Sequence, residues 1–497
     1  MKRRSFVGAA AALASLASLP RTLAATPVYD FIVVGAGTAG LPAAIFASRR
    51  GARVLLLDAA PDIGGTLHVS TGQMAAAGTK LQKARGIVDT PQRHYDDCMR
   101  ISHSTADPDI VRLAVTHAAE TFDWLCDNGL QPLPDHPLLG LGHEPYRERR
   151  YAWGPQGGVS ILAVLREQLK PGLANGRVEL KLETSVGALL TDDAGAVVGV
   201  RARSGGREQR YLGRHVLLTC GGYASNAEMF ERLSGYRQYA DMAYRYSQGA
   251  GYELGVSVGG YLRGREHYIS NFGSILQDDQ VPSGYFARWQ VHPQKRPPWE
   301  IYVNARGERF IREDEPSVDA REHALLRQPD LRYWIVFDRE ILDRAPPGIP
   351  SWSSEELRSM FDTHPYFSSA DTLEALAAKI GLDAAALQKT VADYNAGVAL
   401  EKDAFGRVHM PATIGGRGPF YAVRHQATTI TSAVGLAVDR ELRVRRGGGP
   451  PVPNLYAAGE LLGSAQTMGN AAVSGMMVTP ALTFGRLLGS RLPVGGG

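Results

Sequence analysis

The sequence predicts an α/β fold in which a nucleotide-binding domain with a parallel sheet is interrupted by an inserted α+β cap domain. Its 497 residues suffice for two domains of unequal size. Residues 29–34 (YDFIVV) and 52–58 (ARVLLLD) have the apolar pattern of buried strands, and residues 41–50 between them have helical periodicity. After residue 260 the pattern becomes irregular and rich in turns, and a strand pattern returns at 454–458.

A glycine-rich turn joins the first strand to the first helix. In the run Gly35-Ala36-Gly37-Thr38-Ala39-Gly40, the first glycine permits a tight turn and the second lets the backbone approach a pyrophosphate. The third allows the helix to pack closely on the strand, and the helix amides then face the phosphates. Asp58 ends the second strand, where a carboxylate accepts hydrogen bonds from ribose hydroxyls. This order predicts a Rossmann-type domain, without distinguishing FAD from NAD.

The expected domain boundaries follow from these changes of pattern. The nucleotide-binding domain comprises residues 27–260 and 425–490, and the cap domain comprises residues 261–424. Within the first part, Asp107 suits a helix N-cap, and short alternating segments over 177–220 predict several strands. Further helices are expected at 353–361, 371–380, 383–395 and 479–488.

Residues 1–25 have the features of an export signal. Basic residues precede a short run of alanine, leucine and serine, and small residues at 23–25 suit cleavage. The pair Arg3-Arg4 followed by Phe6 resembles a twin-arginine signal, a route for proteins that fold around a cofactor before export. An ordinary secretory signal with a chance arginine pair is the alternative. Both predict export, and we expect a periplasmic protein.

Composition and charge exclude several classes of function. A net charge of +4 with no long run of Lys and Arg predicts no nucleic-acid partner. Cys98, Cys126 and Cys220 form no CxxC, haem or zinc spacing, so we expect neither a disulfide framework nor a metal site. No stretch after the leader is apolar enough to span a bilayer, which predicts no stable membrane insertion.

Five further segments follow one another in a fixed order. They are 64–76 (GGTLHVSTGQMAA), 216–226 (VLLTCGGYASN), 303–313 (VNARGERFIRE), 455–460 (LYAAGE) and 479–486 (TPALTFGR). Together they resemble the flavoproteins of the fumarate reductase and succinate dehydrogenase superfamily. The closing helix resembles that of the superfamily's ketosteroid dehydrogenase-like branch. The resemblance covers nearly the whole chain after the leader and implies FAD, not NAD, as the cofactor.

The resemblance also implies how FAD is held. Glu460 would accept hydrogen bonds from the ribityl hydroxyls, and the helix that begins near Thr479 would direct its positive end at the flavin C2 carbonyl. Thr66 stands where covalently flavinylated relatives have a histidine, so we expect non-covalent FAD. The glycine loop and the resemblance together place cofactor contacts at Gly35, Gly37, Thr38, Ala39, Gly40, Asp58, Gly65, Thr66, Gly72, Gln73, Met74, Val186, Gly221, Gly222, Gly459, Glu460, Gly475, Met477 and Thr479.

The family pattern breaks where fumarate reductases bind substrate. Val318 stands at the position of the catalytic arginine, and Ala472 at that of the C-terminal substrate arginine. Residues 430–435 (ITSAVG) replace the family's HHTMGG segment. A dicarboxylate needs such cations to bind both carboxylates bidentately, so the sequence argues against fumarate. A steroid is not established either, because the YPGPG-type segment of the ketosteroid branch is absent.

Three segments contain candidate catalytic residues. Residues 143–154 are rich in Tyr, Arg and Trp and suit a pocket wall with Tyr146, Arg150 and Tyr151, although a surface loop with ion pairs fits equally well. Arg321 could replace the missing arginine, and a solvent-facing helix position is the alternative. His425 lies on the strand that returns to the FAD domain, where a structural histidine is common.

These observations predict an FAD-dependent oxidoreductase that moves hydride between flavin and a carbon–carbon bond next to a carbonyl or carboxylate. Such an enzyme is a dehydrogenase or an enoate or enone reductase of a small molecule. One glycine loop and no haem motif predict an external electron carrier, a cytochrome or quinone, or oxygen. The alternatives are a flavin oxidase that uses oxygen and a non-catalytic FAD-binding protein.

Overall fold

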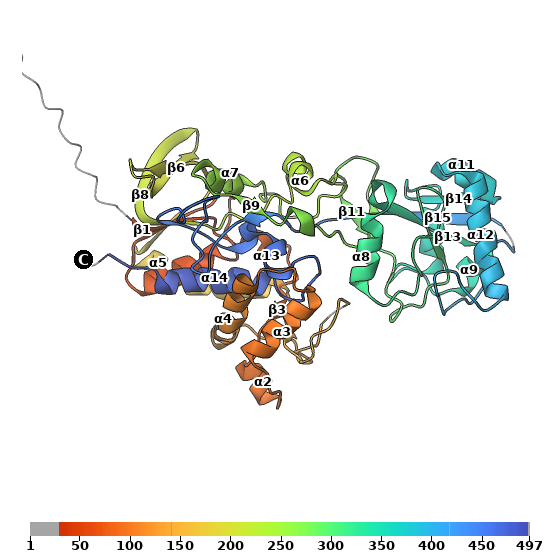
Figure 1. The fold of residues 1–497 in the computed structure, drawn as a ribbon, viewed down its shortest axis with the longest axis horizontal. Coiled ribbons are helices and arrows are strands. Elements are labelled where there is room, and N and C mark those ends of the chain that lie inside the picture. The colour runs from red at the N-terminus through yellow and green to blue at the C-terminus, as the bar shows by residue number, and fades with distance from the viewer. Residues whose placement is uncertain (1–28, 141, 417, 496–497) are drawn as a thin grey trace, which may run out of the picture.

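The computed structural model describes residues 29–140, 142–416 and 418–495 (Figure 1). The predicted export signal lies outside the described residues. None of the helices in the described part of the chain has the length and apolar character needed to cross a membrane.

The secondary structure has the following bounds. The strands are β1 (Tyr29–Val34), β2 (Val54–Leu57), β3 (Met74–Ala75), β4 (Tyr151–Ala152), β5 (Val178–Lys181), β6 (Thr184–Thr191), β7 (Val197–Ser204), β8 (Arg207–Leu218), β9 (Leu262–Arg263), β10 (Ile275–Leu276), β11 (Tyr285–Ala287), β12 (Ile301–Asn304), β13 (Arg332–Asp338), β14 (Phe367–Ala370), β15 (Phe420–Gln426), β16 (Gly435–Leu436) and β17 (Leu455–Ala457). The α-helices are α1 (Gly40–Arg49), α2 (Lys80–Ala84), α3 (Pro91–Ile101), α4 (Pro108–Asp127), α5 (Gly158–Ala174), α6 (Ala227–Ser234), α7 (Ala250–Ser257), α8 (Val318–Leu326), α9 (Arg339–Arg344), α10 (Ser354–Met360), α11 (Leu373–Ile380), α12 (Ala384–Ala399), α13 (Ser464–Met468) and α14 (Val478–Arg491).

A seven-stranded sheet forms the centre of the FAD domain. Strand β1 lies between β2 and β8 and runs parallel to both, and β5 and β17 extend this parallel part on either side. Phe31, Ile32 and Val33 are all fully buried. Because neighbouring strand residues point to opposite faces, both faces of β1 are covered, as its unbroken apolar run predicts. Strands β6 and β7 add an antiparallel extension to β8, which confirms the predicted short strands.

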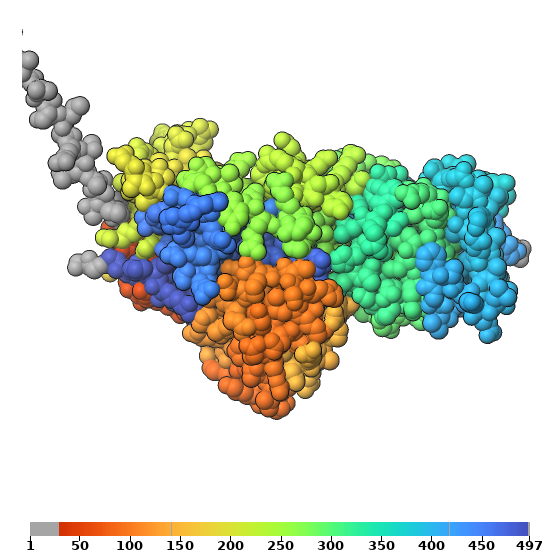
Figure 2. All heavy atoms as spheres, in the orientation of Figure 1, coloured from red at the N-terminus to blue at the C-terminus, as the bar shows by residue number. Residues whose placement is uncertain are grey.

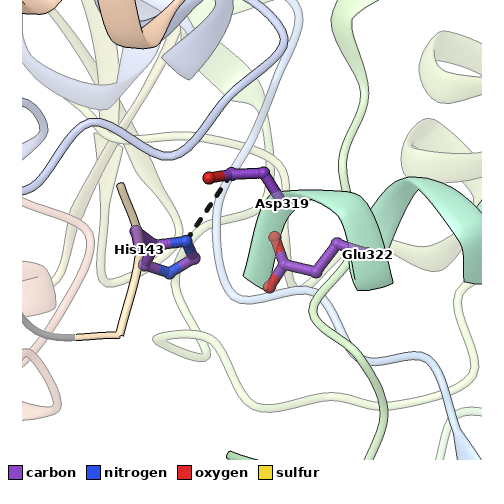
Figure 3. Close-up of side chains that lie close together, drawn as sticks. All are labelled: His143, Asp319 and Glu322. Carbon is purple, nitrogen blue, oxygen red and sulfur yellow. Dashed lines mark ion pairs between the residues drawn. The ribbon is translucent and has the colours of Figure 1, made fainter. Parts of the chain in front are cut away.

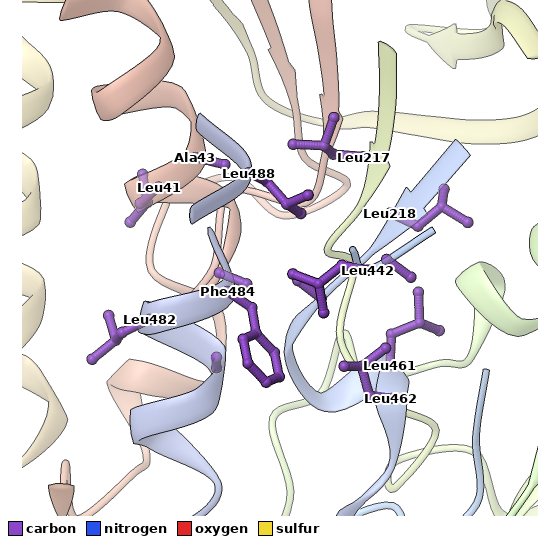
Figure 4. Packing of buried hydrophobic residues seen from close by; sticks show 14 of the residues in the cluster. Leu41, Ala43, Leu217, Leu218, Leu442, Leu461, Leu462, Leu482, Phe484 and Leu488 are labelled. Atoms are coloured by element: carbon purple, nitrogen blue, oxygen red, sulfur yellow. The ribbon is translucent and has the colours of Figure 1, made fainter. Parts of the chain in front are cut away.

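The last helix, α14, packs on the first, α1. A Cβ at Gly485 would lie 1.9 Å from the Ala39 carbonyl oxygen, and one at Gly489 would lie 2.4 Å from that of Ala43, so glycine permits this close approach. Phe484 of α14 belongs to the main core, which also contains leucines of β8 and of the segments that precede α14 (Figure 4). The contact brings the C-terminal part of the chain back onto the nucleotide-binding loop.

The cap domain has its own sheet and its own core. Its four strands are all antiparallel, in the order β12-β13-β15-β14, and a separate cluster of buried apolar residues extends from Ala240 to Ala427. Figure 1 shows this domain extending from one end of the FAD domain. The α/β fold with an inserted α+β cap is therefore confirmed, while the boundaries at 260/261 and 424/425 stay predictions.

Helices α2 to α4 form a lobe that projects from the FAD domain (Figure 2). Helix α4 begins as predicted, since the Asp107 carboxylate accepts hydrogen bonds from Asp109 N at 2.9 Å and from Ile110 N at 3.1 Å. Helices α2 and α3 were not predicted, because α2 has only five residues and the buried face of α3 includes the polar residues His94 and Asp97. Their starts are fixed by Thr79 and Thr90, whose side chains accept hydrogen bonds from first-turn amides.

Candidate functional site

The turn between β1 and α1 is fixed by contacts that leave no room for a side chain. Gly35 has φ of +108°, and a Cβ at Gly40 would lie 1.8 Å from the Gly35 carbonyl oxygen. The Thr219 hydroxyl, on the segment after β8, donates a hydrogen bond of 2.8 Å to the same oxygen. Gly40 therefore packs helix on strand, and Gly37 in the middle of the turn is left facing the cavity.

Asp58 lies at the carboxyl end of β2 and lines the same cavity. Its two carboxylate oxygens accept hydrogen bonds from Ala36 N at 2.6 Å and Ala60 N at 2.8 Å. Burial raises the pKa of Asp58, and these two amides lower it in part. Since each oxygen uses one lone pair in this way, each retains another for a ribose hydroxyl.

Glu460 is a half-buried acid of the site, and it follows β17. Ser432 donates two hydrogen bonds to Glu460 Oε1, from its backbone N at 2.9 Å and its hydroxyl at 3.0 Å. Within the described residues Oε2 has no such donor, and Glu460 lines the cavity. Burial raises the pKa of this carboxyl group. Its Oε2 atom is therefore free to accept a hydrogen bond from a ligand hydroxyl in the cavity.

These groups line one cavity of about 750 Å³. That volume suits a cofactor together with a small substrate. Most of the predicted cofactor residues line it, namely Gly35, Gly37, Thr38, Ala39, Asp58, Gly65, Thr66, Gln73, Val186, Gly221, Gly459, Glu460, Gly475 and Met477.

The first turn of α14 borders the cavity. Met477 is the N-cap residue and provides no side-chain hydrogen bond to the helix. Thr479 N already donates to the Gly475 carbonyl oxygen at 3.1 Å and Pro480 has no N–H, so Val478 N is the amide among the first three helical residues that is left for a ligand. Met477, Val478 and Ala481 line the cavity. The positive end of the helix therefore faces the space in which a reduced flavin would carry negative charge.

The other predicted cofactor residues support the wall from behind. A Cβ at Gly72 would lie 2.4 Å from the Gly157 carbonyl carbon, and one at Gly222 would lie 2.6 Å from Glu460 Oε1. Met74 pairs with Ala152 in the short β3–β4 ladder. The Thr479 hydroxyl accepts a hydrogen bond of 2.9 Å from Ala75 N. Gly40 belongs to this group too, since it packs against the turn.

Tyr151 is the one predicted catalytic residue that lines the cavity. Tyr146 is buried behind the wall and donates its hydroxyl hydrogen to the Ser474 carbonyl oxygen. Arg150 is also buried, and it forms ion pairs with Asp89 at 2.8 Å and Asp97 at 2.7 Å. Residues 150 and 151 are neighbours on an extended segment, so their side chains point to opposite sides of it.

Arg321 and His425 lie inside the cap. The Arg321 guanidinium is fully buried, donates to the Val291 carbonyl oxygen, and has no carboxylate within ion-pair distance among the described residues. The alternative of a solvent-facing helix position is excluded by this burial. His425 is fully buried, accepts a hydrogen bond of 3.3 Å from Trp289 N, and has its pKa lowered by burial to about 3. Neither residue lines the cavity.

Residues beyond those predicted complete the substrate end of the cavity. His143 lines it, and Asp319 and Glu322 of α8 lie behind His143. The ligand atoms of these three residues lie within 4.8 Å of one another, close enough to share a proton or a metal ion. A carboxylate pair one helical turn apart was the available signal in the sequence, but nothing in it indicates that α8 meets residue 143.

The comparisons with known proteins agree with this site. A family model described as an FAD binding domain matches residues 30–475, and the chain belongs to this family. It is 30% identical over 481 residues to a probable fumarate reductase, Ifc3, of Shewanella frigidimarina, with 95% of this chain and 76% of the relative covered. It is 27% identical over 461 residues to vinyl phenol reductase of Lactiplantibacillus plantarum, with 88% and 90% covered.

Solved structures agree in fold. The open conformation of a flavocytochrome c3 fumarate reductase matches with a TM-score of 0.70 and 28% identity, over 94% of this chain and 78% of that one. A 3-ketosteroid Δ1-dehydrogenase from Sterolibacterium denitrificans matches with a TM-score of 0.72 over 93% and 98%, and at 21% identity it shows the fold alone. The predictions of FAD as cofactor and of an FAD-dependent oxidoreductase acting on CH–CH groups are therefore confirmed.

Proposed function

We propose that the protein reduces, or in the reverse direction forms, a carbon–carbon double bond in an aromatic or alicyclic substrate that carries at most one negative charge. One observation carries this proposal: none of the described residues that line the cavity is lysine or arginine. A dicarboxylate would have no cation to pair with either carboxylate. The substrate end instead combines apolar residues such as Ile430 and Val473 with the polar groups of Tyr151 and His143.

The chain's own residues divide the work of binding. The glycine turn and Asp58 hold the adenosine and phosphate part of FAD, and Glu460 holds the ribityl chain. Bound FAD supplies two-electron hydride chemistry next to the substrate. The start of α14 stabilises negative charge at the flavin end. Thr66 has no ring nitrogen that could form a covalent bond with the flavin. The nearby His68 donates a hydrogen bond of 2.9 Å from Nε2 to the Ile63 carbonyl oxygen. FAD is therefore held by non-covalent contacts.

Anaerobic reoxidation of the reduced holoprotein tests the substrate class. We expect 4-vinylphenol, cinnamate or 2-cyclohexen-1-one to restore the oxidised flavin spectrum, and fumarate to be slower by at least about 100-fold. Two missing charged hydrogen bonds, each worth about 1.5–3 kcal/mol, account for that factor. Fumarate turnover matching the best substrate contradicts the proposal. Rapid reoxidation by air with peroxide release favours an oxidase, and no reoxidation by any compound favours a non-catalytic FAD-binding protein.

We also propose that the protein is exported folded by its twin-arginine leader and exchanges electrons with an external carrier, a cytochrome or quinone. A relative from Shewanella frigidimarina, 29% identical over 484 residues, is named fumarate reductase (cytochrome), which supports this kind of partner. With Arg3 and Arg4 both changed to lysine, we expect the precursor to stay in the cytoplasm, because this export route requires the arginine pair. Cell fractionation measures this, with Lys2→Arg as the control. Unchanged export of the double variant indicates an ordinary secretory signal instead.

A further inference from the structure

A histidine and two carboxylates from distant parts of the chain meet at the substrate end of the cavity. His143 lies on a loop of the FAD domain, and Asp319 and Glu322 lie one turn apart on α8 of the cap (Figure 3). The His143 Nδ1 atom lies 3.6 Å from Asp319 Oδ1. Figure 3 shows the other ring nitrogen pointing away from Asp319. His143 lines the cavity, so Nε2 is the ring nitrogen left for a substrate.

The position of Asp319 is fixed by the cavity wall itself. Its Oδ1 atom accepts a hydrogen bond of 3.1 Å from Ala472 N, and Ala472 lines the cavity. Asp319 therefore connects the cavity wall at Ala472 with the ring of His143.

Titratable and charged groups of the cap surround His143. Asp319 and Glu322 face it from α8, Arg321 lies on the same helix, and His292 lies on the preceding cap loop. Burial lowers the pKa of His143, but the two carboxylates outweigh burial and Arg321, and the net effect is a raised pKa. Burial, together with Asp319, raises the pKa of Glu322 to about 7, against the opposing effects of His143 and Arg321. Arg288 also lowers the pKa of Glu322.

We propose that His143 is the proton donor and acceptor of the reaction, oriented by Asp319 and resupplied with protons through Glu322. This rests on the proposed function. In the reductive direction the substrate β-carbon gains the hydride that bound, reduced FAD supplies. The π electron pair of the double bond forms a new C–H bond at the α-carbon with the proton that leaves His143 Nε2. The N–H electron pair stays on the ring, which becomes neutral. Glu322 then returns a proton to the ring and takes one from solvent.

The first test is the pH dependence of substrate reduction by the holoenzyme. His143→Gln is expected to lower kcat by about 100-fold or more, the usual contribution of a general acid. A histidine acid is active below its pKa, so the wild-type rate falls as the pH rises through the raised pKa of His143. Asp319→Asn removes a carboxylate that raises this pKa, and the fall moves to lower pH. His117→Gln is the matched control, because His117 is a half-buried residue of α4 that does not line the cavity.

The second test does not depend on turnover. With ¹³C-labelled histidine, the His143 signal in the holoprotein is identified by its loss in His143→Gln among the 13 histidines. We expect its titration midpoint to lie above 6.5, the ordinary histidine value, and to fall in Asp319→Asn and in Glu322→Gln. An unchanged midpoint in both variants overturns the pairing on which the proposal depends.

The two tests separate this inference from the proposed function. If wild-type protein reduces none of the compounds but the titration behaves as expected, the substrate proposal fails and the acid–histidine pairing stands. If wild-type protein turns over and His143→Gln retains its kcat, the proton-transfer role is overturned. Purified holoprotein that contains one tightly bound divalent metal per chain, lost in His143→Gln, also overturns it, because the same three ligand atoms would then hold the metal.

Discussion

The variant Gly40→Val is expected to be purified without FAD. A Cβ at this position would lie 1.8 Å from the Gly35 carbonyl oxygen and 2.7 Å from the Thr219 hydroxyl oxygen, and the turn cannot yield because that hydroxyl anchors it. The start of α1 must therefore move away from β1, and its amides leave the phosphates. Losing these hydrogen bonds to the phosphates reduces the binding free energy by about 1.4 kcal/mol or more, which lowers the affinity for FAD at least about tenfold. The ratio of flavin to protein absorbance measures this.

Gly447→Val is the matched control for this variant. A Cβ at Gly447 meets no atom within 4 Å, and its backbone is not in the left-handed region. We expect this protein to carry as much FAD as the wild type. Full flavin content in Gly40→Val, with an unchanged visible spectrum, would contradict the assignment of this turn as the phosphate-binding loop.

The parts of the fold that were predicted are those whose signals are local. The apolar runs of β1 and β2, the glycines between them and the Asp107 cap each depend on residues within one or two turns of the chain. Cofactor residues follow from the same order, because a Rossmann-type turn and the end of its second strand always meet at one edge of the sheet. Asp58 lies in the cavity for this reason.

The substrate end was predicted less well because it is assembled from distant segments. His143, Asp319 and Ala472 come from a loop, a cap helix and the segment before α14, and their contact depends on how the cap lies on the FAD domain. The Tyr- and Arg-rich stretch at 143–154 also conceals two environments. Alternation along the extended chain places Tyr151 in the cavity and Arg150 in a buried ion-pair cluster.

The variant Arg150→Met is expected to destabilise the FAD domain by about 3–5 kcal/mol, because it leaves the buried Asp89 without a cation and removes from Asp97 its one buried cation. Asp89 and Asp97 have no more than 1% of their side chains exposed, and Arg150 bridges them. Urea unfolding followed by flavin fluorescence and tryptophan emission measures the loss. Arg147→Met is the matched control, since Arg147 is 68% exposed and contacts the same Asp97 at 3.7 Å. Its effect should be no more than about 1 kcal/mol.

The pH dependence of this deficit shows whether lost charge or lost packing causes it. Hydrogen bonds from Arg147 N and Arg150 outweigh burial and lower the pKa of Asp97 in the folded protein. This lowered pKa adds to the free energy of unfolding at pH values above the pKa of Asp97 in the unfolded chain, about 3.9. The contribution is lost as the pH falls through the lower pKa of Asp97 in the folded protein. In Arg150→Met, Asp97 loses its buried cation and keeps the more exposed Arg100 at 3.1 Å and Arg147 at 3.7 Å. Its pKa is then lowered less, so the difference from wild type should shrink on acidification. A deficit that stays constant with pH would instead indicate a packing defect. Restored stability in the variant that combines Arg150→Met with Asp89→Asn and Asp97→Asn would locate the cost in the buried charges.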